Sequence, residues 1–169
     1  MKTLIVIDMQ NDFINGALGT PEAQAIVPKV KKKIEEYANR GEHIIFTRDT
    51  HHRANYIHSQ EGRKLPVAHC MMFETGWHIS HELKDYAYSY ENGHKVNKAS
   101  FGYTGWDAWY NELSEEVELV GLCTDICVVS NALILKAIYP EIEITVDASC
   151  CAGTTPENHK AALQVMKCC

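Results

Sequence analysis

The chain has 169 residues and a net charge of −6 at neutral pH; 46% of its residues are hydrophobic and 22% are charged. This length and composition are typical of one globular domain with its own core. The excess of acidic residues argues against nucleic-acid binding, which needs a basic surface. No apolar stretch is long enough to cross a bilayer, and Leu4–Ile7 is too short for a secretion signal. We therefore expect a single domain over residues 1–169, located in the cytoplasm, that binds neither nucleic acid nor membrane.

The pattern of hydrophobic residues and turn residues predicts strands that alternate with helices. In chain order, the predicted elements are strand Thr3–Ile7, helix Pro21–Arg40, strand His43–Thr47, helix Trp77–Tyr86, strand Gly93–Asn97, helix Trp106–Leu113, strand Val117–Leu122, helix Asp125–Ile138, strand Ile142–Val146 and helix Pro156–Lys167. Between the second strand and the next helix, Arg48–Gly76 is a long polar loop, and loops of this length are usually functional. The alternation favours an α/β fold with a mainly parallel sheet and right-handed crossovers.

The seven cysteines are an odd number, which does not suggest a disulfide framework in a cytosolic chain. Cys150 and Cys151 read as small buried hydrophobic residues near the end of a strand. Cys168 and Cys169 fall in the C-terminal tail, and no role is assigned to them.

Four polar residues stand at or just after the ends of the predicted strands. Asp8 follows the first strand, Asp49 the second and Lys98 the third, while Cys127 begins the helix after the fourth. In a parallel sheet the ligand lies beyond the carboxyl ends of the strands. These four side chains, which are far apart in sequence, are therefore expected to meet at one edge of the sheet.

Cys127 is a candidate nucleophile. Thr124 or Asp125 is expected to cap the helix that follows, which places Cys127 in the first turn. There the unpaired backbone N–H groups and the helix dipole favour a thiolate and can hold an oxyanion. The alternative is that Cys127 is one more buried thiol.

Asp8 and Lys98 are candidate partners of this cysteine. A carboxylate at the end of a hydrophobic strand suits a general base that takes the thiol proton. Lys98 is suited to hold that carboxylate and to stabilise charge. The alternatives are that Asp8 makes a cap or loop hydrogen bond and that Lys98 is an exposed lysine at a strand end.

A second cluster of candidate residues lies in the long polar loop. Asp49 and His51 are two residues apart, which puts both side chains on one side of an extended segment. A carboxylate with two imidazoles suits Zn²⁺, Fe²⁺ or Mn²⁺. The further candidate ligands in this loop are His52, His58, Glu61 and His69. A histidine-rich surface loop is the alternative.

Several common enzyme motifs are absent from the sequence. The chain has no His-Glu-x-x-His zinc motif, no phosphate-binding loop of the Gly-x-x-x-x-Gly-Lys-Ser/Thr type and no Gly-x-Gly-x-x-Gly after its first strand. It also lacks the Gly-x-Ser-x-Gly nucleophile elbow. Zincin, nucleotide-binding and serine-hydrolase interpretations are therefore disfavoured.

Three segments, in this order, resemble the isochorismatase-like cysteine hydrolases along essentially the whole chain. They are Asp8–Phe13 (DMQNDF), Lys98–Phe101 (KASF) and Gly121–Val128 (GLCTDICV). The resemblance implies a three-layer αβα, Rossmann-like fold with a six-stranded parallel sheet. It also implies a catalytic triad of Asp8, Lys98 and Cys127. A cis peptide bond is implied at Leu122–Cys123, with the backbone N–H groups of Cys123 and Cys127 as the oxyanion hole.

Within this family, Asp49-x-His51 followed by His69 resembles the nicotinamidase/pyrazinamidase branch. The resemblance implies that Asp49, His51 and His69 bind one divalent metal ion per chain (Zn, Fe or Mn). Glu61 is the expected fourth ligand, with His58 as the competing candidate. The implied reaction is hydrolysis of nicotinamide to nicotinate and ammonia, with a role in NAD salvage, by a homo-oligomer.

The sequence departs from the usual nicotinamidase near the substrate. Thr50 and His52 replace the tryptophan and proline common after the Asp-x-His start, and Leu65–Ala68 lacks a tryptophan that helps to sandwich the pyridine ring. Phe13 remains available to stack on the ring, with Tyr103 or Trp77 as a second aromatic contact. The alternatives are a hydrolase for another small amide, carbamoyl compound or vinyl ether, and a catalytically silent binding protein.

Overall fold

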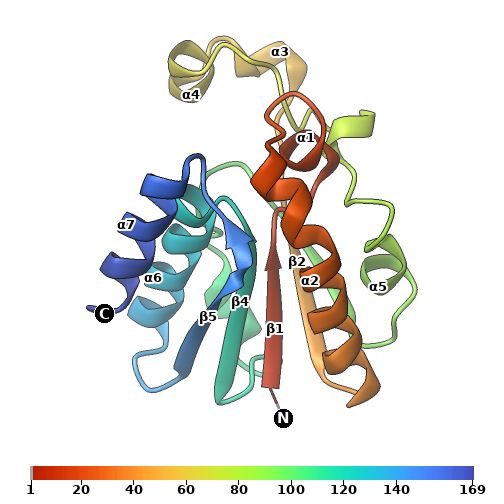
Figure 1. Ribbon diagram of the computed structural model, residues 1–169, viewed down its shortest axis with the longest axis vertical. Coiled ribbons are helices and arrows are strands. Elements are labelled where there is room, and N and C mark those ends of the chain that lie inside the picture. The colour runs from red at the N-terminus through yellow and green to blue at the C-terminus, as the bar shows by residue number, and fades with distance from the viewer. Residues whose placement is uncertain (1) are drawn as a thin grey trace.

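The computed structural model describes residues 2–169, which form a parallel sheet between two layers of helices (Figure 1). The strands are β1 (Lys2–Ile7), β2 (His43–Asp49), β3 (Gly93–Lys98), β4 (Glu116–Leu122) and β5 (Glu143–Ala152). The helices are α1 (Asn11–Ile14), α2 (Pro21–Asn39), α3 (Arg53–Tyr56), α4 (Gln60–Lys64), α5 (Lys84–Tyr88), α6 (Val129–Ile138) and α7 (Pro156–Met166). Two 3₁₀ turns, η1 (Thr75–Trp77) and η2 (Trp106–Trp109), and a π-helical turn, η3 (Thr124–Val128), complete the elements.

The strand order is β3-β2-β1-β4-β5, and every neighbouring pair is parallel. This confirms the predicted α/β fold with a parallel sheet. Residues 2–169 form five strands instead of the six that the family resemblance implied. From β1 the chain winds outward through β2 to β3, then returns to the other side of β1 for β4 and β5. The switch point of the sheet therefore lies between β1 and β4.

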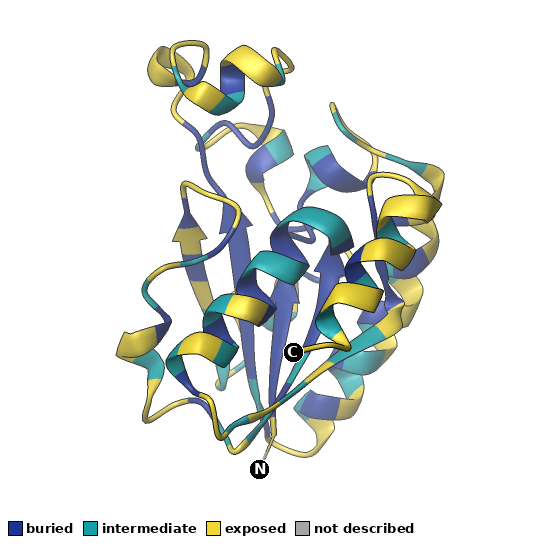
Figure 2. Ribbon diagram, turned by 90° about the vertical axis from the view of Figure 1, so that its left-hand side faces the viewer, coloured by how far each residue is buried: buried dark blue, intermediate teal, exposed yellow. Residues whose placement is uncertain are grey.

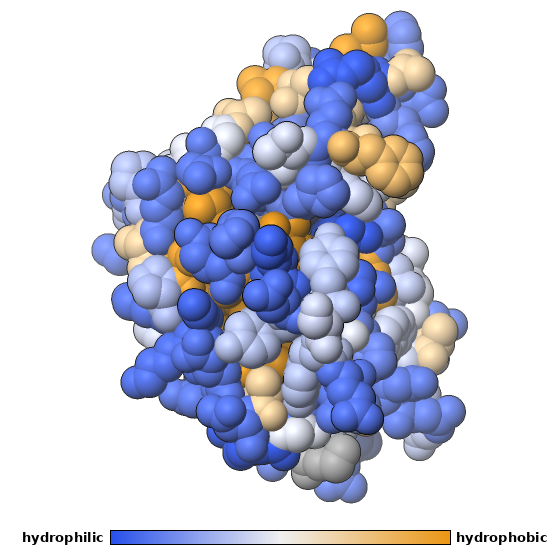
Figure 3. Space-filling view, turned by 90° about the vertical axis from the view of Figure 1, so that its right-hand side faces the viewer, coloured by the Kyte–Doolittle hydropathy of each residue, from blue (hydrophilic) through white to orange (hydrophobic). Residues whose placement is uncertain are grey.

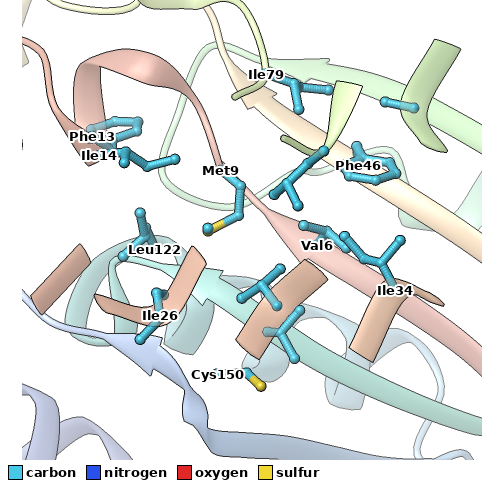
Figure 4. Packing of buried hydrophobic residues seen from close by; sticks show 14 of the residues in the cluster. Val6, Met9, Phe13, Ile14, Ile26, Ile34, Phe46, Ile79, Leu122 and Cys150 are labelled. Carbon is cyan, nitrogen blue, oxygen red and sulfur yellow. The ribbon is translucent and has the colours of Figure 1, made fainter. Parts of the chain in front are cut away.

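Each face of the sheet carries its own hydrophobic cluster. On one face, side chains from β1, α2 and α5 pack together around Val6, Phe46 and Leu122, several of which are drawn in Figure 4. On the other face, Ile5 and Ile45 pack under η2 and α6, with Trp106 fully buried among them. The side chains of alternate residues in the central strands thus point to opposite faces of the sheet, as expected for a sheet covered on both sides.

Helix α2 forms where the sequence predicts it. Thr20 caps the helix by accepting a hydrogen bond from the Ala23 N–H at 3.0 Å, and Pro21 occupies the first turn. Ile26, Val30 and Ile34 keep helical spacing and are buried against the sheet. The helix ends at Asn39, one residue before the predicted end.

Three predicted helices differ from those observed. Trp77–Tyr86 is not a helix: η1 ends at Trp77 and the helix that follows is α5, Lys84–Tyr88. Trp106–Leu113 contains only the 3₁₀ turn η2. The helix predicted to begin at Asp125 starts with the π-helical turn η3 before α6. Elements of three to five residues are too short for hydrophobic periodicity to define them.

Strand β5 is longer than predicted because it contains a bulge. Its pairing with β4 shifts register between Leu119 and Gly121, which pair with Val146 and Cys151. The strand continues to Ala152 instead of ending at Val146. Beyond the bulge, Cys150 packs in one hydrophobic cluster and Cys151 in the other, which confirms that both are small buried hydrophobic residues.

The polar stretch predicted as a loop contains α3 and α4, which project beyond the sheet at the edge where the strands end (Figure 1). Figure 2 shows that this projection is mostly exposed. Figure 3 shows a mostly hydrophilic face with hydrophobic side chains near this end and in smaller groups elsewhere. The exposed hydrophobic residues in this part of the chain include Ile57 and Phe73. Within residues 2–169, no helix combines the length and the apolar character needed to cross a bilayer.

We predict that Gly121→Ala destabilises the fold strongly. Gly121 has a φ of 120°, and a Cβ there would lie 2.1 Å from the carbonyl oxygen of Ile7 in β1. Urea unfolding should give a loss of about 3 kcal/mol or more in the free energy of unfolding. Gly41→Ala is the matched control: its φ is 71°, but nothing lies within 4 Å of a Cβ, so a loss of only ~1 kcal/mol is expected. Equal losses in both variants would contradict the assigned contact between β1 and β4.

Candidate active site

The predicted site residues come together at the carboxyl edge of the sheet. Asp8 follows β1 directly, and Asp49 and Lys98 are the last residues of β2 and β3. Cys127 lies in η3, the turn after β4. The site therefore straddles the switch point between β1 and β4, the position at which doubly wound sheets bind their ligands.

Lys98 lies at the centre of this group. Its Nζ is 2.7 Å from Asp8 Oδ2, 3.4 Å from Cys127 Sγ and 3.7 Å from Asp49 Oδ1. Asp8 is fully buried, and only 3% of Lys98 and 5% of Cys127 is exposed. Burial of this degree makes the ion pair sensitive to the loss of either partner, because the remaining charge would be left without compensation.

Thr47 holds Asp8 in position. Its hydroxyl donates a hydrogen bond to Asp8 Oδ1 at 2.6 Å and accepts one from the Asp8 backbone N–H at 3.1 Å. Asp8 has a φ of 47°, a left-handed conformation that aspartate tolerates better than most residues do. The carboxylate is therefore oriented from two sides, by Thr47 and by Lys98.

The environment determines where protons reside in this group. Burial raises the pKa of Asp8, and the nearby Lys98 ammonium partly opposes this. Burial alone would lower the pKa of Lys98, but the Asp8 carboxylate raises it above its usual range. Burial, followed by the charge of Asp8, raises the pKa of the Cys127 thiol well above its usual value. Burial and the charge of Asp8 therefore oppose the thiolate form of Cys127, which the helix start was expected to favour.

The turn that carries Cys127 differs from the predicted cap. No side chain caps η3: Thr124 Oγ1 is hydrogen-bonded to His159 Nδ1, and Asp125 accepts a hydrogen bond from the Thr154 N–H. The Leu122–Cys123 peptide bond is cis, as the family resemblance implied. Within residues 2–169, the backbone N–H of Cys123 donates no hydrogen bond to another group of the protein.

Asp49, His51, Glu61 and His69 form a second cluster, in which one ligand atom from each residue lies within 4.8 Å of those of the others. Asp49 Oδ2 is 2.9 Å from His51 Nε2 and 3.4 Å from His69 Nε2. Glu61 Oε1 is 3.5 Å from His51 Nε2 and 3.6 Å from His69 Nε2. The close contacts with the two imidazoles lower the pKa of Glu61 to about 2, which favours its carboxylate form.

The residues of this cluster fit a divalent metal ion. His69 Nδ1 lies 2.8 Å from the Val67 carbonyl oxygen, so this nitrogen carries the proton when the ring is neutral and leaves a lone pair on Nε2. His51 Nε2 is buried and makes no hydrogen bond of acceptable geometry, despite its short contact with Asp49. Two imidazoles with two carboxylates suit Zn²⁺, Fe²⁺ or Mn²⁺.

Members of both clusters line one cavity of about 280 Å³: Cys127 from the first, Glu61 and His69 from the second, and Asp49, which contacts both. Its polar lining residues are Asp49, Glu61, His69, Cys123, Cys127, Thr20 and Thr154, and its apolar ones are Phe13, Leu18, Leu65, Phe101 and Ile126. A mostly apolar cavity with a few converging polar groups is typical of a small-molecule site.

The predicted substrate contacts differ in their position relative to this cavity. Phe13 lines the cavity, and its ring centroid is 5.6 Å from that of His69. Tyr103 does not line the cavity; it packs edge-on against Trp106 under the opposite hydrophobic cluster. Trp77 is buried beneath the Arg48 guanidinium. The aromatic residue that follows Lys98 and lines the cavity is Phe101.

Glu61 and His58, the two candidates for a fourth ligand, differ in their position relative to this cluster. Glu61 belongs to the four-residue cluster, whereas His58 has an exposed side chain and lies outside it. Tyr56, in α3, packs against both imidazoles of the cluster, with ring centroids 4.8 Å from His51 and 5.3 Å from His69. Helices α3 and α4 thus place Glu61 next to Asp49, His51 and His69.

Sequence reasoning missed residues that support the site. Gln10 is fully buried, and its side chain accepts a hydrogen bond from the Asp49 N–H and donates to the carbonyl oxygens of Asp49 and Trp77. Thr47 orients Asp8, as described above. The only available signal was that Gln10 and Thr47 are polar residues at strand ends, because their partners are distant in sequence.

Comparisons with known proteins identify the family and agree with the fold. The isochorismatase domain family matches residues 2–169. A nicotinamidase of Saccharomyces cerevisiae is 40% identical over 53 residues, which are 30% of this chain and 24% of the yeast protein. The structure of the pyrazinamidase of Pyrococcus horikoshii in complex with zinc has a TM-score of 0.83 at 29% identity and covers 99% of this chain and 94% of that one.

A related structure belongs to a different amidase. The N-carbamoylsarcosine amidase of Thermoplasma acidophilum has a TM-score of 0.78 at 27% identity and covers 99% of this chain and 94% of that one. The similar structures therefore include hydrolases of more than one small amide. Since the family match extends over all the described residues, this chain belongs to the isochorismatase family of hydrolases.

Proposed function

We propose that the protein is a cysteine amidohydrolase that converts a small carboxamide to the acid and ammonia, with nicotinamide as the leading substrate. The observation that carries this proposal is the buried contact of Lys98 with Asp8 and Cys127, because Cys127 lines a cavity that Asp49, Glu61 and His69 of the second cluster also line. A nucleophile, a base and a cation within reach of one small cavity suit attack on a neutral carbonyl group.

In the first half of the proposed reaction, Asp8 accepts the proton of Cys127 as the sulfur attacks the amide carbon. Its raised pKa suits this role, because a base works best when its pKa approaches the operating pH. The backbone N–H groups of Cys123 and Cys127 stabilise the oxyanion. Asp8 then gives its proton to the leaving nitrogen, ammonia departs, and the acyl group remains on the sulfur as a thioester.

In the second half, water enters the cavity and attacks the thioester. Asp8 accepts a proton from this water, and the same two N–H groups hold the new oxyanion. The C–S bond breaks, the acid leaves, and the sulfur recovers a proton from Asp8. Lys98 stays paired with Asp8 throughout and compensates its charge in this buried site.

The residues Asp49, His51, Glu61 and His69 would hold a divalent metal ion, which supplies a Lewis-acid contact for a lone pair of the substrate and so orients it. Phe13 and Phe101 provide apolar wall on which a flat ring can rest. Leu65 lines the cavity in a segment where the nicotinamidase branch usually has a tryptophan. The ring is therefore held by a partly aliphatic wall.

A second candidate is hydrolysis of a carbamoyl compound or another small amide. The similarity to an N-carbamoylsarcosine amidase and the aliphatic Leu65 both favour it. A panel of nicotinamide, pyrazinamide, aliphatic amides and carbamoyl amino acids separates the two candidates by kcat/KM. No observation favours a silent binding protein. A cytoplasmic homo-oligomer active in NAD salvage is part of the leading proposal.

Cys127→Ala should abolish ammonia release from nicotinamide. Without the sulfur no thioester forms, and kcat should fall by at least about 10⁴-fold. Cys150→Ala is the matched control, because Cys150 is also a buried thiol but lies in the core away from the cavity. It should keep its activity and lose ~1 kcal/mol of stability. Ammonia release by the Cys127 variant would refute the nucleophile, whereas an inactive wild type with nicotinamide would refute only that substrate.

Thr47→Val should move the acid limb of the kcat/KM profile to higher pH. The Thr47 hydroxyl stabilises the carboxylate form of Asp8 and so lowers its pKa against the effect of burial. Asp8 must be ionised to accept the thiol proton, so activity is lost as pH falls through the pKa of Asp8. A higher pKa therefore moves this loss to higher pH. Thr145→Val, the same change in β5 away from the cavity, should leave the profile unchanged. A limb that stays in place or moves to lower pH would contradict the role of Asp8.

His51→Ala should abolish metal binding, and His58→Ala should preserve it. His51 belongs to the four-residue cluster, whereas His58 is exposed outside it. Elemental analysis of protein purified without a histidine tag should find about one divalent ion per chain in the wild type and in the His58 variant. The ion should also raise the Tm of both proteins. Loss of metal from the His58 variant would identify a different ligand set.

A further inference from the structure

Asn131 is a buried polar residue that the proposed mechanism does not use. It lies in α6, one helical turn after Cys127, and is fully buried. A buried side-chain amide is costly unless its hydrogen-bonding groups are satisfied. The partners of Asn131 therefore show what it holds together.

All four hydrogen-bonding positions of the Asn131 amide are occupied. Nδ2 donates to the carbonyl oxygens of Cys127 at 2.8 Å and Phe101 at 3.3 Å. Oδ1 accepts from the Tyr103 backbone N–H and from Trp106 Nε1, both at 2.9 Å. The last two groups can only donate, so the chemistry of the partners determines which amide atom is oxygen.

These bonds join the turn of the nucleophile to the segment that follows Lys98. Within this segment, the Lys98 ammonium donates to the Ser100 carbonyl oxygen at 3.2 Å as well as to Cys127 Sγ. Gly102 packs so closely on α6 that a Cβ there would lie 2.3 Å from Ile134 Cδ1. Residues 98–103 thus contact α6 at several points. Among these contacts, Asn131 also donates a hydrogen bond to the backbone of Cys127.

We propose that Asn131 is a positioning residue, which sets the distance between Lys98 Nζ and Cys127 Sγ by fastening residues 98–103 to the turn of Cys127. This inference rests on the proposed hydrolase function. Asn131 does not line the cavity and has no contact with the reacting atoms. It acts through the backbone on both sides of the Lys98–Cys127 contact.

Two variants remove the bonds in different ways. Asn131→Asp keeps the shape but has no N–H to donate to the carbonyl oxygens of Cys127 and Phe101. Asn131→Ala removes all four bonds without adding charge. An effect common to both variants therefore cannot come from charge alone or from a cavity alone. The matched control is Tyr139→Phe, which removes a buried hydrogen bond to the Trp106 carbonyl oxygen in the same hydrophobic cluster but none to residues 98–103.

The first measurement is the steady-state rate with the amide that the wild type hydrolyses best. Both Asn131 variants should lose about 10- to 100-fold, mainly in kcat, because a small displacement of reacting groups is costly. Tyr139→Phe should lose a comparable amount of stability, ~1 kcal/mol, and keep its kcat. Equal kcat values in the Asn131 variants and the control would overturn the proposal and leave the hydrolase function intact.

The second measurement does not depend on turnover. Alkylation of Cys127 by iodoacetamide at one mildly alkaline pH, followed by peptide mass analysis, should be slower in both Asn131 variants, by about tenfold for each unit of increase in the thiol pKa. The reason is that the Lys98 ammonium would no longer lie next to the sulfur. Unchanged or faster alkylation relative to Tyr139→Phe would overturn the proposal, even if the wild type hydrolyses none of the amides tested. Failure of both Asn131 variants to fold, with a folded control, would assign Asn131 to stability and overturn it too.

Discussion

The ion pair between Asp8 and Lys98 joins two strands that are not neighbours, because β2 lies between β1 and β3. Lys98 therefore reaches across the end of β2, where Asp49 lies 3.7 Å from its ammonium group. Two carboxylates and a thiol surround one buried cation, and this cation makes their proximity tolerable. The rest of the site depends on it: without Lys98, Asp8 and Asp49 would repel each other, and Asp8 would lose a group that holds it near the sulfur.

The metal cluster and the nucleophile are linked through the same strand end. Asp49 contributes to both, since it contacts Lys98 on one side and His51 and His69 on the other. Gln10 holds the backbone of Asp49 on both its N–H and its carbonyl sides. A change in the metal-ligand cluster that displaces Asp49 therefore alters the charge balance around Cys127. The charges and the orientations of the side chains around the cavity thus depend on one connected set of contacts.

The sequence was informative where a polar residue directly follows a recognisable hydrophobic strand. Asp8, Asp49 and Lys98 could be expected at one edge because parallel strands end together. The position of Tyr103 outside the cavity could not be predicted, because proximity to Lys98 in sequence does not reveal which side of the sheet a loop residue faces. Asn131 was overlooked because its partners include backbone groups 28 and 30 residues away. The π-helical turn and the short helices are too short for hydrophobic periodicity to define them.

The order of the strands determines when the catalytic residues come together as the chain folds. Asp8, Lys98 and the ligand cluster all belong to residues 2–98, whereas the sulfur and the free Cys123 N–H come from the segment after β4. The two parts meet through pairing of β1 with β4, in which Lys2 lies opposite Glu116. Contacts between such distant residues form late, because the intervening chain must first be ordered. In a nascent or truncated chain, Asp8 and Cys127 are therefore apart, and the cavity with its full set of catalytic groups forms only with the completed sheet.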